Sequence, residues 1–219
     1  MAKIGIVSGL LEEADSFRPG RGEVLSDVPF YARREDGCII ACAGMGKVNA
    51  AVASTFLLSQ GCEILLSVGV AGRIGTDQHR SYWVQEAVQH DYGSWREDGF
   101  RPYRAGSMPF GDETLQLFTA IDNPGIDLPT ARIATGDSFI EAAQCAAEIR
   151  GKHGAELVDM ETAAIAQVAA LCGKTWGAIR TVSDSASEGS VAEFRQNLAD
   201  AAATAAQHAD RVVKLLERH

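Results

Sequence analysis

Residues 63–72 have the sequence EILLSVGVAG, and no charged side chain follows Glu63 within this stretch. A strand that is apolar at successive positions, instead of at alternate ones, is buried on both faces. Strands of this kind occur in parallel sheets that helices cover on either side. We therefore predict that residues 63–72 form a central strand of an α/β fold.

The segments before this strand repeat one pattern, a short β-branched run followed by a stretch with helical spacing. Residues 3–9 (KIGIVSG) lead into a predicted helix at 10–17, and residues 37–46 (GCIIACAGMG) lead into one at 47–61. Each pair therefore reads as a buried strand that feeds a helix.

The same pattern continues toward the C-terminus. An alanine-rich helix is predicted from Glu161 onward, and apolar residues three or four positions apart predict a long amphipathic helix within 192–219. Further strands are predicted at residues 131–140, 156–160 and 175–184. This alternation predicts one domain over residues 1–219, a three-layer α/β/α fold with a mostly parallel mixed central sheet.

Composition excludes several classes of partner. The formal charge is -9, the pI is about 5.0, and no basic run is present, which argues against nucleic acid. No apolar run has the length of a membrane span, and the N-terminal run is too short for a signal peptide, so we expect a cytoplasmic protein without a membrane partner. Five cysteines without CxxC spacing predict reduced core thiols and no metal site.

Residues 73–130 form the least regular region, rich in Gly, Pro and aromatic residues. A long segment of this kind inside a compact domain is usually a lid or a contact surface. We expect one of these two roles.

Three acidic residues, Glu13, Glu161 and Asp184, each follow a predicted strand. A single acid at the start of a helix is explained by the helix dipole. Three of them at the edge of one sheet suit a reaction that develops positive charge and moves protons, as glycosidic bond cleavage does. Ser183 and Arg180 would orient Asp184, unless Arg180 pairs with a surface carboxylate.

Several motifs together resemble the purine nucleoside phosphorylase/uridine phosphorylase superfamily over nearly the whole chain. Within it, the sequence is most similar to the 5'-methylthioadenosine/S-adenosylhomocysteine nucleosidases. The resemblance implies a nucleoside phosphorylase-like fold, a small-molecule nucleoside substrate, no cofactor and a homodimer. The motifs are KIGIVSGLLEEA, GMGKVNAA, SVGVAG, HD at His90 and Asp91, IATGDSFI, VDMETAAIAQV and IRTVSD.

The resemblance also implies catalytic roles. Asp184 matches the general acid that protonates N7 of the purine, with Ser183 and Arg180 as its positioning neighbours. Glu13 matches the glutamate that binds and deprotonates the attacking water. Glu12 is adjacent, so the register of this assignment stays open between the two.

Substrate contacts follow from the same resemblance. Met160 would pack on the ribose, Glu161 would accept hydrogen bonds from its hydroxyls, and Val70 stands where many relatives have a small polar residue near the sugar. The remaining matches are Phe139, which stacks on the purine, Ile140, whose backbone reads the base edge, and Met45 and Phe194, which enclose a 5'-alkylthio group. Packing in the core is the alternative for Met160, Met45 and Phe194, and an ordinary strand core is the alternative for Phe139 and Ile140.

The chain departs from the family in residues 73–112, so the 5' substituent stays open, and futalosine or another adenosyl derivative is an alternative substrate. His79, Arg80, Arg101 and Arg104 would recognise an acidic substituent, or else lie in a solvated loop. Two further alternatives are a phosphorylase that uses phosphate in place of water and a nucleoside-binding protein without catalysis.

Overall fold

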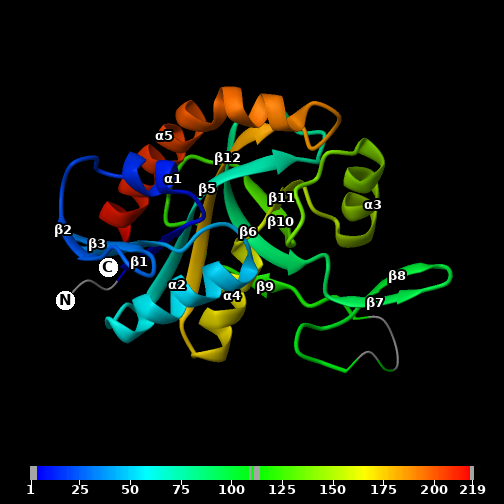
Figure 1. Cartoon of the computed structure of the whole chain (residues 1–219), viewed down its shortest axis with the longest axis horizontal. Helices are drawn as coiled ribbons and strands as arrows, with labels where there is room; N and C mark the ends of the chain where they lie inside the picture. The colour runs from blue at the N-terminus through cyan, green and yellow to red at the C-terminus, as the bar shows by residue number, and fades with distance from the viewer. Residues whose placement is uncertain (1–3, 109, 111–113, 218–219) are drawn as a thin grey trace.

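The computed structural model describes residues 4–108, 110 and 114–217. A large mixed β-sheet lies between two layers of helices (Figure 1). Helices α1 (Leu11–Ser16) and α5 (Ser190–Leu216) pack together on one face, and α2 (Lys47–Ser59) and α4 (Thr162–Leu171) pack together on the other. Helix α3 (Ala143–His153) covers one end of the sheet. The predicted three-layer α/β/α fold is confirmed.

Ten strands form the main sheet in the order β11-β10-β6-β12-β5-β1-β4-β3-β2, with β9 paired to β6. Strands β1, β4, β5 and β12 are mutually parallel, whereas β6, β10 and β11 run in the opposite direction. The strands are β1 (Ile4–Ser8), β2 (Glu23–Ser26), β3 (Tyr31–Glu35), β4 (Cys38–Cys42), β5 (Ile64–Arg73), β6 (Ser81–Gln89), β9 (Phe118–Thr119), β10 (Thr130–Thr135), β11 (Leu157–Asp159) and β12 (Thr175–Asp184).

Strand β5 lies between β1 and β12, and all but its two end residues are buried. This confirms the central strand predicted from EILLSVGVAG. Strand β11 also pairs antiparallel with the end of β5, with Leu157 opposite Arg73 and Val158 opposite Gly72. Part of the sheet therefore closes on itself, and this closure brings the segment after β11 to the residues that end β5.

Alanines let α4 approach its neighbours closely. Ala163, Ala166 and Ala169 have no exposed surface, and α4 packs against α2 on one side and against several strands on the other. Larger side chains would hold the helices apart, since cores are packed to near-crystalline density.

The region 73–130 is more regular than predicted. It contains β6, which pairs with β10 and β12 inside the sheet, so the expectation of an irregular segment is wrong for residues 81–89. Strands β7 (Gly93–Arg96) and β8 (Gly99–Pro102) form a separate hairpin, which projects from the body of the molecule (Figure 1). Among the described residues of this region, irregular segments remain before β6, next to the hairpin and on either side of β9.

Three of the five cysteines lie in the core, but Cys145 and Cys172 are exposed, which corrects the expectation for these two. All five thiols are free. Within the described part of the chain, none of the helices is both long and apolar enough to cross a membrane.

Candidate active site

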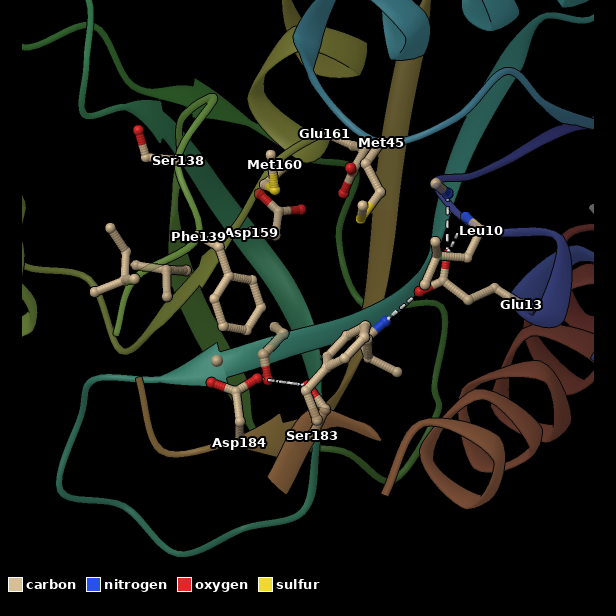
Figure 2. Close-up of a pocket in the computed structure, with 17 residues that line it drawn as sticks. Leu10, Glu13, Met45, Ser138, Phe139, Asp159, Met160, Glu161, Ser183 and Asp184 are labelled. Carbon is tan, nitrogen blue, oxygen red and sulfur yellow. Dashed lines mark hydrogen bonds between the residues drawn. The ribbon is translucent and has the colours of Figure 1, made fainter. Parts of the chain in front are cut away.

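A pocket lies among the segments that end or follow β1, β4, β5, β10, β11 and β12. Its empty space is about 530 Å³, a volume that includes the part open to solvent. Figure 2 shows Glu161, Met45 and Met160 toward one end, Asp184 and Ser183 toward the other, the Phe139 ring between them, and Glu13 on a third side. The pocket therefore gathers carboxyl groups around a largely apolar space.

Three backbone N–H groups fix the side chain of Glu13, which lies in the first turn of α1. Its Oε2 accepts hydrogen bonds from the backbone N–H groups of Gly9 and Leu10, at 3.0 Å each, and its Oε1 accepts one from Val70 at 2.9 Å. Glu13 is the third residue of α1, where a glutamate reaches back to the start of the helix. At Gly69, a Cβ atom would collide with this carboxylate, so only glycine leaves the space for it.

Burial raises the pKa of Glu13, although the charge of Arg180 and the three N–H donors act in the opposite direction. The N–H groups favour the carboxylate form, and desolvation favours the acid. The group is thus a buried base that gains a proton more readily than an exposed glutamate does.

Glu161 occupies the N-cap position of α4, and its Oε1 accepts a hydrogen bond from the N–H of Gly46 at 3.0 Å. Burial raises its pKa to about 8, and the negative charges of Asp159 and Glu13 act in the same direction. A Cβ on Gly9 would lie against Glu161 Oε1, so the two carboxylates Glu13 and Glu161 flank the same glycine turn.

Asp159 forms a buried ion pair with Arg180, with Nη2 of the arginine 2.7 Å from Oδ2 of the aspartate. Arg180 also donates to the hydroxyls of Ser67 and Thr162, at 2.8 Å each. The backbone N–H of Thr162 donates to Asp159 Oδ2 at 3.0 Å, which fixes the first turn of α4. This network lies behind Glu161 and sets the position of the segment that carries it.

Asp184 ends β12 at the other side of the pocket and is 5% exposed. Its Oδ2 accepts a hydrogen bond from Ser183 Oγ at 2.8 Å, and its Oδ1 accepts one from the N–H of Ala186 at 3.0 Å. Burial raises the pKa of Asp184, and these two donors lower it in part. A raised pKa suits a group that must hold a proton near neutral pH.

Aromatic and aliphatic side chains form the remaining walls. The rings of Phe139 and Phe194 meet edge to face with centroids 5.7 Å apart, one from the segment after β10 and the other from α5. Met45, Ile140 and Leu10 also line the pocket. The walls therefore offer a flat aromatic surface beside Asp184 and an apolar region for a further substituent.

An ionic cluster ties two pocket segments together through Asp91, which follows β6. Lys47 Nζ lies 2.6 Å from Asp91 Oδ1, and Asp91 Oδ2 accepts the N–H of Asp137 at 2.9 Å. Asp137 in turn accepts the N–H of Lys47 at 2.8 Å. The segment with Met45 is thereby joined to the one with Phe139.

The structure brings ten of the eleven proposed site residues to the pocket wall. These ten are Glu13, Met45, Val70, Phe139, Ile140, Met160, Glu161, Ser183, Asp184 and Phe194. Glu12 is exposed, so the structure places Glu13 in the pocket, and Val70 contributes its backbone N–H.

Arg180 was expected beside Asp184 or on a surface carboxylate, and both expectations are wrong. It is 2% exposed, and its ion-pair partner is Asp159. A register shift in β12 between Val182 and Asp184 interrupts the strand there, so even spacing does not place Arg180 and Asp184 on one face.

The sequence did not single out seven other wall residues, namely Gly9, Leu10, Ala71, Gly72, Ser138, Val158 and Asp159, as contacts. Each is adjacent or close to a residue that was proposed, so extending every motif by one or two positions would have found most of them. His79, Arg80, Arg101 and Arg104 do not line this pocket, and Arg80 pairs with Asp200 on α5. Among the described residues, no three His, Cys, Asp or Glu side chains are arranged to hold a metal ion.

The comparisons with known proteins define the class. The chain belongs to the phosphorylase superfamily, whose profile matches residues 3–214. Within this superfamily it is similar to the 5'-methylthioadenosine/S-adenosylhomocysteine nucleosidases, which confirms the resemblance found in the sequence. The nucleosidase of that name from Mycobacterium bovis is 30% identical over 207 residues, which cover 81% of each chain.

Two solved structures show the same fold at lower identity. The Helicobacter pylori 5'-methylthioadenosine/S-adenosylhomocysteine nucleosidase has a TM-score of 0.81 at 23% identity and covers 99% of this chain and 98% of its own. The futalosine hydrolase of Helicobacter pylori has a TM-score of 0.80 at 22% identity, and the match covers 99% of this chain and 97% of the hydrolase chain. The fold is thus common to nucleosidases with different substrates.

Proposed function

We propose that the protein hydrolyses the N-glycosidic bond of a 5'-substituted adenosine, of the 5'-methylthioadenosine/S-adenosylhomocysteine type, and releases adenine. The observation that carries this proposal is the arrangement of the pocket carboxyls. Asp184 lies at the aromatic end beside Phe139, and Glu13 and Glu161 lie around the Gly9 turn. A general acid and a general base on different sides of a nucleoside are what hydrolysis of this bond requires.

In this mechanism the bond between C1' and N9 breaks and its electron pair moves into the purine. Asp184 donates its proton to N7, so that adenine leaves as a neutral base. Glu161 accepts hydrogen bonds from the ribose hydroxyls and, in its carboxylate form, stabilises the positive charge that develops on the sugar. Water attacks C1' and transfers a proton to Glu13.

The charge of the pocket favours water over phosphate as the nucleophile. Four carboxyl groups line it, those of Glu13, Asp159, Glu161 and Asp184, and no Lys or Arg is among the lining residues that the structure describes. A phosphate anion needs cationic partners and would find none among these lining residues. A phosphorylase is therefore the second candidate.

The pocket residues expected around the 5' position of the nucleoside favour an uncharged, apolar substituent. Met45, Phe194 and Leu10 line the pocket, and none of the side chains proposed above to recognise an acidic substituent lines it. An acidic 5' group would lose its hydration without gaining a cation.

Adenine release from 5'-methylthioadenosine, S-adenosylhomocysteine, adenosine and futalosine-type nucleosides tests this proposal. We expect the two thioethers to have the highest kcat/KM. A higher kcat/KM for a nucleoside with an acidic 5' group would contradict the assignment of the apolar walls, and tight adenine binding without release from any nucleoside would support a binding protein.

We also propose a homodimer. Large apolar side chains are exposed on the β7–β8 hairpin and the segment after it, including Trp95 (82%), Met108 (66%) and Phe110 (72%), and Val48 on α2 is 74% exposed. We propose that these side chains contribute to an interaction surface. A second copy of the chain is the occupant that the family resemblance supports.

A further inference from the structure

The turn after β12 is fastened to the first turn of α5. The backbone N–H and the hydroxyl of Ser185 both donate to Glu193 Oε2, at 2.8 and 2.9 Å. On the next turn of α5, Asn197 Nδ2 donates to the carbonyl oxygen of Ser183 at 2.8 Å. The start of α5 therefore holds the residues on both sides of Asp184.

The conformation of this turn needs such support. Ala186 has a φ of 48° and is fully buried, and its N–H is the group that donates to Asp184 Oδ1. A non-glycine residue in the left-handed region is strained and persists where its surroundings fix it. The N–H of Ser187 donates to Ser190 Oγ at 2.7 Å, which gives the turn a second attachment to α5.

We propose that Glu193 is a positioning residue for Asp184: it holds the 185–187 turn in the conformation that aims the Asp184 carboxyl into the pocket, and its own negative charge acts on that carboxyl. The catalytic part of this inference rests on the proposed hydrolysis. The neighbouring Phe194 lines the pocket and contacts Phe139. The same helical turn therefore carries both Glu193, which holds the 185–187 turn, and a wall of the substrate site.

The charges around Asp184 agree with this role. Burial raises its pKa most, and the negative charge of Glu193 raises it further, against the lowering effects of Ser183, Ala186 and Ser190. Glu193 differs from the other charged groups nearby because its carboxylate also bonds the turn. Those others are Glu13, Asp159 and Glu161, which share the pocket, and Arg73 and Arg150, which line a groove beside Ser185.

Two substitutions separate the charge of Glu193 from its hydrogen bonds. Glu193→Gln keeps an acceptor for Ser185 but removes the charge. We expect the alkaline limb of its kcat/KM profile for 5'-methylthioadenosine to move to lower pH, because Asp184 then loses its proton at lower pH. Glu193→Ala also frees the turn, and we expect kcat to fall by about tenfold or more from misplacement of the acid.

Glu188→Gln is the matched control. Glu188 is exposed on the same segment, and no side-chain hydrogen bond is found for it among the described residues. Glu188→Gln changes the net charge by the same amount as Glu193→Gln, so we expect this control to keep the wild-type pH profile. A purely structural role for Glu193 would lower activity without moving the profile in the Gln variant.

Amide hydrogen exchange tests the hydrogen bonds between Ser185 and Glu193 without any substrate. The N–H of Ser185 should exchange faster in Glu193→Ala than in the wild type, and Glu193→Gln should retain most of the protection. Unchanged exchange in the Ala variant, or an unmoved pH profile in an active Gln variant, would overturn the inference. If the wild type releases no adenine from any nucleoside, the proposed function fails, and the exchange result alone decides whether Glu193 holds the turn.

Discussion

Glu12 and Glu13 are adjacent in the sequence, but α1 points their side chains to different environments. Glu13 is 6% exposed with three backbone N–H partners, whereas Glu12 faces solvent. The sequence could place a carboxylate at the end of β1 but could not choose between the two. The choice depends on Gly69, 56 positions further along the chain, which leaves room for one carboxylate.

Substitution of each glutamate tests this assignment. Glu13→Gln should reduce kcat by about 100-fold or more, the range for loss of a general base, with a fold that remains intact by circular dichroism. Glu12→Gln is the control and should have wild-type kinetics. Loss of activity in the Glu12 variant with retention in the Glu13 variant would reverse the assignment.

The raised pKa of Glu161 predicts that the free energy of unfolding decreases as the pH rises. Its pKa is about 8 in the folded protein against an ordinary value of 4.5, so the folded state binds the proton more tightly than the unfolded state. Stability from this group is complete below pH 4.5 and is lost as the pH rises through 8. A single pKa unit corresponds to about 1.4 kcal/mol.

Glu161→Gln removes the group that ionises while keeping an acceptor for Gly46. We expect this variant to match the wild type in urea unfolding at pH 4.5 and to be more stable by at least about 1.4 kcal/mol at pH 9. Its adenine release should be strongly reduced. If the variant and the wild type were equally stable at pH 4.5 and also at pH 9, burial of the Glu161 carboxylate would carry no cost in stability.

Arg180 shows where prediction from sequence fails at this scale. Arg180 was proposed as a neighbour of Asp184, but its partner, Asp159, lies 21 positions away and is buried. Spacing along β12 gave no sign of the register shift that separates Arg180 from Asp184.

At the scale of elements, the apolar runs predicted most strands near the site. β1, β4, β5 and β12 are buried throughout or nearly so, and their patterns are visible in the sequence. β6 was missed because SYWVQEAVQ carries polar residues in its second half. Gln85 and Glu86 find partners in Ala120 and Arg132, which are distant in the chain.

The close packing of α4 predicts a strong asymmetry between two of its alanines. Ala166 is fully buried, so Ala166→Leu should overfill the core and destabilise the protein by about 1–3 kcal/mol. Ala170 is exposed on the same helix, and Ala170→Leu should change stability by less than about 0.5 kcal/mol. Thermal unfolding of both variants measures the difference, and equal effects would contradict the packing described for α4.

At the scale of the whole molecule, the β7–β8 hairpin is the part least connected to the sheet, because its strands pair with each other and with no strand of the main sheet in the described residues. Its exposed Trp95 would be costly on a monomer surface. The proposed homodimer gives it a partner.

Trp95→Asp should weaken that dimer without unfolding the protein. Light scattering should give about twice the 23.3 kDa chain mass for the wild type at micromolar concentration and a shift toward the monomer for the variant. Val24→Asp is the control, since Val24 is 60% exposed on β2 at the far edge of the sheet (Figure 1). A monomeric wild type would contradict the proposal.

The central claim is that water, not phosphate, attacks a 5'-substituted adenosine in this pocket. The most direct measurement is adenine release from 5'-methylthioadenosine in phosphate-free buffer made with oxygen-18 water, repeated with added phosphate. The carboxylate-lined pocket predicts equal rates in both, with the heavy oxygen on C1 of the released sugar. Release that requires phosphate and yields a sugar 1-phosphate would contradict it.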